Sequence, residues 1–456
     1  MTTVETPKDA SAVTSTTPQP GRPWQRALTS TEIDTRLFGL LIALIAIWIA
    51  FHILSHGAFL TARNLWNLSV QSTSIAIMAT GMVLIIVSRN IDLSVGSLLG
   101  FLGYTMALIQ TDGILSFFGV DVTVNGLQGK AIVWVVAIIF GIALGAAVGF
   151  LQGFLVAYGG VPAFIVTLGG FLVWRGLIFR IGGKQGQTLA PLHPTFQLLG
   201  GGAKGSLGEW KSWLVALLAC AGIVLSLVFA RRRRQRHELG VRPMWAEIGL
   251  GALGCVAVIA GVGLVANRYE SPITHKATGI AYPVVILIII TLLMSYLARR
   301  RRFGRYVYAY GGNPDAAELG GINTRRTVMM TFVLMGVLCA VSATIQTARL
   351  NAAVTNLGVQ NELDVIAAAV IGGTSFAGGI GTIPGAVLGA IVMQSLRSGM
   401  VLLKIDSPSQ DIVVGVVLVT AVAIDSALRQ GRRRVAGISL AVGLVVAAVI
   451  IQTGRA

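Results

Sequence analysis

Charged residues are scarce in this sequence. They make up 12% of its 456 residues, whereas a soluble globular domain carries about 25%. Hydrophobic residues make up 54% of the chain, and the mean hydropathy is +0.78. These values exclude an ordinary soluble protein and predict a chain that lies in a lipid bilayer.

Acidic residues are fewer than basic ones, with 18 Asp and Glu against 35 Lys and Arg and a net charge of +17. Such an excess can indicate nucleic-acid binding, but that function needs a basic face on a soluble module. Here most arginines lie in short loops between apolar runs, which is typical of the cytoplasmic loops of integral membrane proteins. We therefore expect the bilayer, and not a nucleic acid, as the partner.

Cysteine and histidine are also rare. Cys220, Cys255 and Cys339 each lie in an apolar run without CxxC spacing, so they are interpreted as small core residues. Among the five histidines only His52 and His56 stand at helical spacing, and no third ligand is near them in sequence. We expect no bound metal and no cofactor.

Motifs for ATP hydrolysis and for intramembrane proteolysis are missing. The pattern GxxxxGK[ST] does not occur, and GGKQG at 182–186 lacks the Ser or Thr that would hold magnesium. HExxH does not occur either. The sequence therefore predicts a protein that is not itself an enzyme.

Long apolar runs dominate what is present. A bilayer crossing needs about 17 to 25 mostly apolar residues, and such runs predict an all-α polytopic transmembrane bundle. The candidate spans are 37–54, 70–88, 93–111, 131–157, 163–181, 212–230, 245–266, 280–298, 328–347, 362–380, 384–402, 411–427 and 436–451.

The distribution of arginine predicts the orientation. The strongly basic loops 231–242, 301–327 and 429–434 should face the cytoplasm. The span 362–380 contains GGTSFAGGIG, and it must be a broken crossing if 429–434 is to lie on that side. The N-terminus is then cytoplasmic, and the C-terminus is external if 436–451 is a real span.

Three regions follow from this pattern. Residues 1–30 are rich in Thr, Ser and Pro and lack the apolar core of a signal peptide, which predicts a disordered cytoplasmic tail. Residues 31–430 form the transmembrane domain. Residues 431–456 combine a basic segment with an additional C-terminal span.

A glycine stripe marks one expected span. The run FGIALGAAVGFLQGF places Gly141, Gly145, Gly149 and Gly153 four residues apart, on one face of a helix. Small residues let helix backbones approach closely in a bilayer, where the hydrophobic effect adds little. The stripe predicts tight packing against another helix of the fold, with a dimer contact as the alternative.

Polar residues interrupt the apolar pattern in SRNIDLSVGS (88–97), VPAFIVTLGG (161–170) and NELDVIAAAVIGGTSFAGGIGTIPG (361–385). Irregular or charged segments at membrane depth must be buried in protein or line a cavity. For Asp92, a helix N-cap at the membrane surface is an equally good interpretation. The candidate pathway residues are Asp92, Ser94, Thr167, Glu362, Asp364, Thr374 and Ser375.

A short helix is expected between the arginines of 301–327. Asn313 suits an N-cap and Pro314 the first helical position, Asp315 and Glu318 lie near the positive end, and Gly320 and Gly321 stop the helix. Ala316, Ala317 and Leu319 complete about two turns. So short a helix is marginal alone, so it should dock on a cytoplasmic partner, with the small alanines deep in a groove; a mere connector is the alternative.

The motifs NIDLSVGS, VPAFIVTLG, GGNPDAAELGGI followed by NTRRT, and ELDVIAAAVIGGTSFAGGIGTIPGAVLGA occur in this order. Together they resemble permease subunits of bacterial ATP-binding-cassette sugar importers of the ribose and xylose type, over about residues 35–430. The additional apolar pair around RRRRQRH is similar to xylose-type permeases, and a multiple-monosaccharide permease has a similar layout.

This resemblance implies that Asn313, Pro314, Ala316, Ala317 and Gly320 form a cytoplasmic coupling helix that docks on separate ATPase subunits. It also implies a periplasmic sugar-binding protein, a homodimer or close heterodimer of permeases around one pathway, and a place in the bacterial inner membrane. We expect alternating access, with the sugar passing between weakly polar surfaces.

An ion-gradient-driven secondary transporter is the competing class. It needs ionisable groups at mid-membrane, and the span centres are almost free of them. Transport of D-xylose by an ATP-driven importer is therefore the preferred function, with ribose or several monosaccharides as alternative substrates.

Overall fold

The structure is a computed structural model. It describes residues 35–111, 114–117, 120–123, 131–181, 188–202, 204–238, 243–270 and 275–429. The expected tail at 1–30 and the segment 431–456, including the candidate span 436–451, lie outside the described residues.

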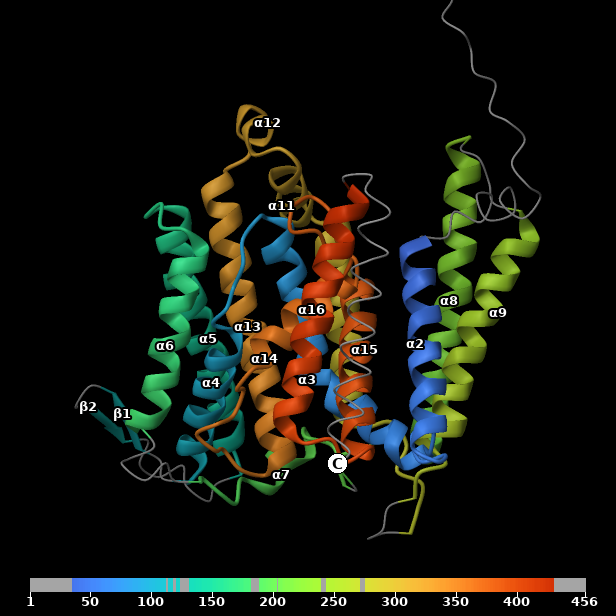
Figure 1. The fold of residues 1–456 in the computed structure, drawn as a ribbon, viewed down its shortest axis with the longest axis horizontal. Coiled ribbons are helices and arrows are strands. Elements are labelled where there is room, and N and C mark those ends of the chain that lie inside the picture. Colours follow the sequence, from blue (N-terminus) through green and yellow to red (C-terminus); the bar gives the residue numbers. More distant parts are fainter. Residues whose placement is uncertain are drawn as a thin grey trace, which may run out of the picture.

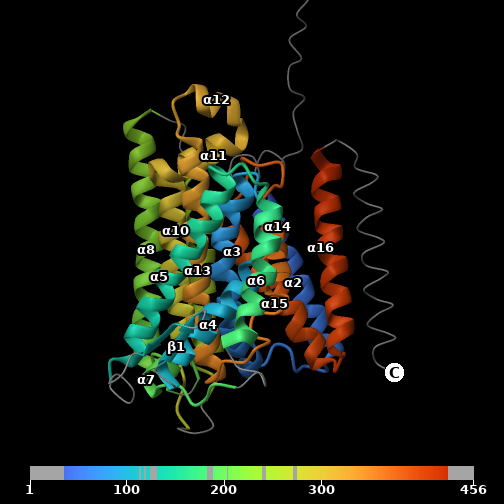
Figure 2. The same cartoon turned by 90° about the vertical axis from the view of Figure 1, so that its left-hand side faces the viewer.

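The described chain is almost entirely helical (Figures 1 and 2). One antiparallel hairpin, β1 (Ile114–Phe117) and β2 (Val120–Thr123), is the exception within it. The helices are α2 (Thr35–Leu54), α3 (Ala62–Val87), α4 (Val95–Thr111), α5 (Val133–Ala157), α6 (Ala163–Ile181), α7 (Pro194–Leu198), α8 (Glu209–Arg236), α9 (Met244–Ala260), η1 (Gly261–Ala266), α10 (Tyr282–Arg300), α11 (Arg302–Gly312), α12 (Pro314–Leu319), α13 (Thr324–Leu350), α14 (Asn361–Ile371), α15 (Ile383–Leu402) and α16 (Ser407–Arg429).

Nine helices in the described ranges are long and apolar enough to cross a membrane, and α4 and the described part of α16 are shorter apolar helices. The expected all-α polytopic bundle is confirmed. Helices α12 and α7 lie at opposite ends of it (Figure 1), and we name these the α12 end and the α7 end.

Helix α3 is the centre of the bundle. Its most apolar window is 94% buried, and α10, α13, α14 and α15 all pack around it. Two of its buried hydroxyl groups are satisfied within the helix, since Thr73 and Thr80 donate to Val70 O at 2.6 Å and Ile77 O at 2.7 Å. The central helix therefore carries buried threonines without leaving these donors unpaired.

The pair α8 and α9 lies at the edge of the bundle (Figure 1). The apolar window of α8 is only 6% buried, and the pair contacts the bundle through η1, which packs on α3. Near the α12 end, Arg231 Nη1 and Glu247 Oε2 join the two helices at 2.7 Å. The additional apolar pair of the sequence thus forms a separate helical hairpin.

The expected span 362–380 is a broken crossing of an unexpected kind. Its helical part, α14, has only 11 residues, and the ten residues before it, 351–360, are turns and bends. The glycine-rich segment 372–382 follows α14 and contacts α11 at the α12 end. The helix of this span thus ends where GGTSFAGGIG begins, as the sequence predicted, and a second non-helical segment precedes α14.

The glycine stripe of α5 packs inside the chain. A Cβ atom at Gly145 or Gly149 would meet the carbonyl oxygens of Gly336 and Phe332 on α13, and one at Gly153 would lie 2.7 Å from Met329 O. Gly141 faces Met106 on α4. Packing between α5 and its neighbours thus accounts for the stripe without a second copy of the chain.

Leucine at Gly145 or Gly149 should therefore lower the amount of folded protein. Backbone atoms of α13 cannot move aside as a flexible side chain can, so we expect a cost of about 1–3 kcal/mol or more. Fluorescence-detected gel filtration of membrane extracts measures the effect. The matched control is Gly176→Leu on α6, where a Cβ atom would meet nothing within 4 Å; equal loss in all three variants would contradict the packing argument.

Candidate translocation site and coupling helix

A polar cavity of about 250 Å³ lies inside the bundle. Helices α3, α13, α14 and α15 form its walls, together with the segment that precedes α14. Its lining residues are Val70, Gln71, Ser74, Ile75, Ile345, Gln346, Arg349, Val359, Asn361, Asp364, Gln394 and Arg397. Helix α3 lines the cavity with residues of its first half, and its other end lies beside α11. Helix α13 lines the cavity with residues close to its own end at Leu350. The cavity therefore lies in the half of the bundle nearer the α7 end.

Carboxamide side chains dominate the polar part of this lining. Gln394 Nε2 donates to Gln71 Oε1 at 2.9 Å, which joins α15 to α3. Asn361 Nδ2 and Ser74 Oγ both donate to Gln346 Oε1, at 3.1 and 3.3 Å. These bonds use only part of the hydrogen-bonding capacity of a carboxamide, which has two N–H groups and a carbonyl oxygen.

A bidentate ion pair forms one side of the cavity. Arg397 Nε and Nη2 contact the two carboxylate oxygens of Asp364 at 2.8 and 3.0 Å. Asp364 is 2% exposed, and Asp411 of α16 lies 3.5 Å from Arg397 Nη1. The charge of Asp364 is thus paired across α14 and α15, as a buried carboxylate requires.

The sequence-predicted residues near α4 form a different cluster. Ser94 donates both its backbone N–H and its Oγ–H to Asp92 Oδ1, at 2.8 and 2.7 Å. Gln152 of α5 donates to Ser94 Oγ at 2.9 Å, and Thr167 of α6 donates to Ala163 O at 2.9 Å. Asp92 thus organises the turn that leads into α4, and this turn is buried away from the polar cavity.

The remaining pathway candidates do not join the cavity either. Glu362 is 8% exposed, and its Oε2 has no hydrogen-bond partner within the described chain. Thr374 and Ser375 are buried in the segment after α14, where Ser375 Oγ accepts from Ala377 N at 3.1 Å. Of the seven predicted pathway residues, only Asp364 lines the cavity.

Sequence reasoning missed Gln71, Gln346, Gln394 and Arg397. Gln71 begins the polar run QSTS (71–74), Gln346 lies in TIQT (344–347), and Gln394 and Arg397 lie three residues apart in QSLRS (394–398). The available signal was the cost of one polar side chain at membrane depth. That signal marks each residue, but it does not indicate that they share one cavity.

The short helix α12 forms as the sequence predicts. Asn313 is its N-cap and accepts a bond from Ala316 N at 3.0 Å. Pro314 occupies the first turn, and Gly320 N–H donates back to Ala316 O at 3.0 Å. The helix projects at the α12 end of the bundle, beyond α11 and α13 (Figures 1 and 2).

The side chains of Ala316 and Ala317 on α12 point in different directions, Ala316 outward and Ala317 inward. Ala317 is 5% exposed and faces the protein, whereas Leu319 is 90% exposed. Asp315, Ala316 and Glu318 are also exposed. The expectation of an alanine pair facing a partner is therefore wrong for Ala317, because the helix turns that position toward its own bundle.

A junction of glycines connects α11 to the bundle. Arg89 donates from Nε to Gly311 O at 2.8 Å and from Nη2 to Gly312 O at 3.0 Å, at the negative end of α11. Gly379 N–H donates to Val87 O at 3.0 Å, and a Cβ atom at Gly311 would meet both of these groups. The residues immediately before α12 are thus held against the end of α3.

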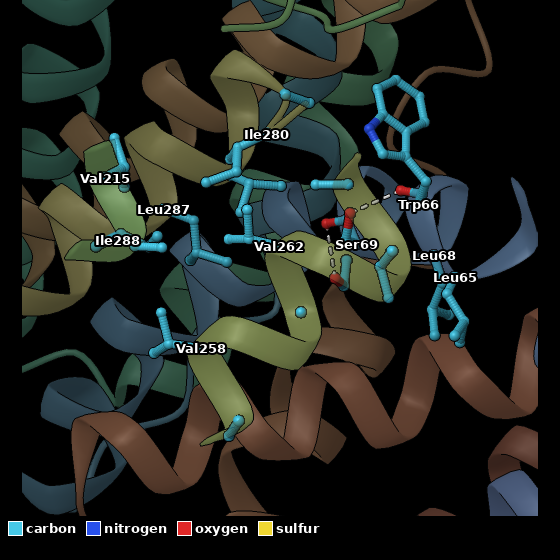
Figure 3. A pocket seen from close by; sticks show the side chains of 18 of the residues that line it. Leu65, Trp66, Leu68, Ser69, Val215, Val258, Val262, Ile280, Leu287 and Ile288 are labelled. Carbon is cyan, nitrogen blue, oxygen red and sulfur yellow. Dashed lines mark hydrogen bonds between the residues drawn. The ribbon is translucent and has the colours of Figure 1, made fainter. Parts of the chain in front are cut away.

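A larger cavity, of about 360 Å³, separates the pair α8 and α9 from the bundle (Figure 3). Its walls are almost wholly apolar, with Val258, Val262, Ile280 and Leu287 facing inward (Figure 3). The hydroxyl of Ser69 is bonded to Trp66 O at 2.7 Å. This cavity therefore offers little to a hydroxylated solute and is not the translocation site.

No group of three or more His, Cys, Asp or Glu side chains that could hold a metal ion occurs in the described ranges. The cysteines are free in the structure; Cys339 is buried, and Cys220 and Cys255 are partly buried.

Arg397→Met should strongly destabilise the protein, because it leaves Asp364 buried without its partner. The expected cost is about 3–5 kcal/mol. The double variant Asp364→Leu/Arg397→Met removes both charges and should recover most of the loss. Thermal unfolding of the purified variants in detergent measures both effects; an unfolding temperature of Arg397→Met equal to that of the wild type would show that Asp364 is hydrated.

Comparison with known proteins also indicates a transport permease. The family described as branched-chain amino acid transport system / permease component matches residues 64–422. The xylose transport system permease protein XylH of Haemophilus influenzae is 38% identical over 395 residues, which cover 87% of this chain and 97% of that protein. XylH of Escherichia coli K12 is 36% identical over 399 residues, covering 88% and 94%.

The ribose import permease protein RbsC of Escherichia coli K12 is 32% identical over 370 residues, covering 81% of this chain and 87% of that protein. No solved structure gives a significant match. The candidate spans and these relatives identify a multi-pass protein of the inner membrane. The chain belongs to this transport-system permease family, among the ribose- and xylose-type permeases of ATP-binding-cassette sugar importers.

Proposed function

We propose that this chain is the membrane-spanning subunit of an importer that moves D-xylose into the cytoplasm by alternating access. ATP is hydrolysed on separate subunits that dock on α12, and a sugar-binding protein delivers the sugar at the α7 end. Two copies of the chain, or this chain and a close relative, surround the pathway. Both partners, the ATPase and the sugar-binding protein, are inferred from the importer family to which the chain belongs.

The single observation that carries this proposal is the form of α12. A helix of six residues cannot cross a bilayer, and it is too short to be stable alone in water. It is nevertheless capped at both ends and presents Leu319 outward at 90% exposure. A rigid helix with an exposed apolar side chain suits docking on another protein.

The basic residues support an orientation with α12 in the cytoplasm. The C-terminal turn of α8 carries Arg233, Arg234 and Arg236, and α8 ends at the α12 end of the bundle (Figure 1). Arg299 and Arg300 close α10 just before α11. Arginine gathers on the cytoplasmic side of membrane proteins, so these residues favour the same side for α12.

The choice of D-xylose rests on the relatives. Two proteins named as xylose permeases align with 87% and 88% of this chain, at 38% and 36% identity. The protein named as a ribose permease aligns with 81% at 32% identity. The hairpin of α8 and α9 also matches the layout that the sequence shares with xylose-type permeases.

Leu319→Arg should remove the ATPase while leaving the permease folded, because the side chain makes little contact with its own bundle. We expect the variant to insert normally, to lose the co-purifying ATPase and to lose sugar uptake. Leu319→Met keeps the apolar surface and is the matched control. Ala317→Arg is a poorer test, since that side chain is buried and the variant would disturb α12 itself.

The readout is paired: ATPase retained on the purified permease, and D-xylose uptake into vesicles with and without internal ATP. Full retention and normal uptake in Leu319→Arg would remove the docking role of α12. Uptake by the wild type without ATP would instead identify an ion-driven carrier.

Topology gives a separate test. A reporter fused after Arg236 should read as cytoplasmic, and so should one fused after Arg302, because both positions follow arginine clusters at the α12 end. A reporter inserted between α7 and α8 should read as periplasmic. If both basic positions read as periplasmic, the ATPase could not reach α12.

A further inference from the structure

Arg89 occupies a backbone position that usually belongs to glycine. It follows Ser88, the C-cap of α3, and has a φ of 60°. Its N–H donates back to Ile86 O at 2.9 Å, and the next N–H, of Asn90, donates to Ile85 O at 3.0 Å. These bonds close α3 in a Schellman motif, whose left-handed residue is most often glycine because glycine has no Cβ atom. An arginine here strains the backbone.

The side chain of Arg89 makes contacts that a glycine could not make. Its Nε donates to Gly311 O at 2.8 Å, and its Nη2 donates to Gly312 O at 3.0 Å. These carbonyls end α11, where a helix has no partners for its carbonyl groups and carries a partial negative charge. Two adjacent donors of one guanidinium thus hold two consecutive carbonyls. Because strained residues gather at functional sites, these contacts indicate a role for the side chain.

The same side chain lies against the connection between α14 and α15. A Cβ atom at Gly378 would be 2.5 Å from Arg89 Cγ and 3.1 Å from Arg89 Nε, so the arginine passes directly over this glycine. The next residue, Gly379, donates its N–H to Val87 O at 3.0 Å. Arg89 therefore contacts two parts of the bundle besides its own helix α3, namely the end of α11 and the segment 372–382.

Packing and one tyrosine complete this junction. Tyr308 Oη donates to Gly381 O at 2.8 Å, which joins α11 to the segment 372–382. A Cβ atom at Gly311 would meet Val87 O, so α11 and α3 also touch through their backbones. Within the described chain, the hydrogen bonds between α11 and the end of α3 are the two that Arg89 donates. The polar link from α3 to α11 is therefore this one side chain.

The carbonyls that Arg89 binds lie directly before α12. Helix α11 ends at Gly312, and Asn313 is at once its C-cap and the N-cap of α12. No flexible loop separates the two helices, so a force on α12 acts first on Gly311 and Gly312. Through Arg89 it then acts on α3, whose most apolar window is 94% buried. A helix packed so closely cannot move without its neighbours.

We propose that Arg89 is a positioning residue that couples α12 to the centre of the bundle. When the ATPase moves α12, the guanidinium makes α3 and the segment 372–382 move with it. Without this link α12 turns while the bundle keeps its conformation, so ATP is hydrolysed and no sugar passes. The proposal rests on the proposed function, in which the ATPase docks on α12, and it names the residue that transmits the movement.

Arg89→Gly is the sharpest test, because it removes the side chain and suits the backbone. The chain also offers a matched control. Lys404 holds the same position after α15, with a φ of 60° and an N–H that donates to Val401 O at 3.0 Å. Its side chain is exposed, and it lies at the α7 end, far from α12. Lys404→Gly thus makes the same backbone change without touching the junction.

The readout is the number of ATP molecules hydrolysed for each D-xylose taken up by the complete importer in proteoliposomes. Arg89→Gly should raise this ratio by about two- to tenfold, the range that one hydrogen bond represents, while the ATPase stays bound and the unfolding temperature does not fall. Lys404→Gly should keep the wild-type ratio. Arg89→Lys retains a cationic donor but not the fork of two donors, so its ratio should lie between those of the wild type and Arg89→Gly.

A wild-type ratio in Arg89→Gly, with the ATPase bound, would overturn this proposal and leave the proposed function standing. An equal rise in Lys404→Gly would overturn it too, because the effect would then follow from the backbone change. If Arg89→Gly folds poorly, Arg89→Met takes its place, since it keeps the contact with Gly378 and removes both donors; the same ratios decide. Absence of ATP-dependent D-xylose uptake by the wild type would overturn the proposed function itself.

Discussion

Direct contact between backbones, made possible by glycine, is the constraint on which the rest of this structure depends. Apolar burial drives little association between helices surrounded by lipid, so close approach and dispersion hold them together. Gly145 of α5 and Gly336 of α13 face each other's carbonyls, and Gly389 of α15 faces Ala368 of α14. Any larger side chain at these positions would separate the helices, and the polar cavity between α3, α13, α14 and α15 would lose its shape.

The same kind of contact joins the two ends of the molecule. Gly311, directly before Gly312 and the N-cap of α12, lies against Val87 at the end of α3 and against Gly379. Helix α3 carries Gln71 to the cavity, and the segment that contains Gly379 connects α14 to α15, which carry Asp364 and Gln394. A displacement of α11 would therefore also move the ends of α3, α14 and α15, which line the cavity. Arg89 adds a polar contact, because it donates to the carbonyl oxygens of Gly311 and Gly312.

The sequence predicted those features that depend on neighbouring residues. Hydropathy is a local property, so the described spans were found, and the caps of α12 were found from Asn313 to Gly321 because capping needs only adjacent residues. The direction of Ala317 was not predictable, since it depends on how α12 sits on the bundle. The cavity was missed because Gln71, Gln346 and Gln394 stand far apart in sequence, and only tertiary packing brings them together.

The buried ion pair also bears on how such a protein could be driven. Carriers coupled to an ion gradient often use an ionisable side chain that changes partner or protonation during the cycle. Asp364 is instead bonded at both oxygens to Arg397 on the adjacent helix, with Asp411 beside it. Releasing Asp364 for a cation would leave the partly buried guanidinium of Arg397 with only the more distant Asp411, at a cost of several kcal/mol. Energy supplied from outside the bundle, through a surface such as α12, avoids this cost because the pair can remain intact while the helices move.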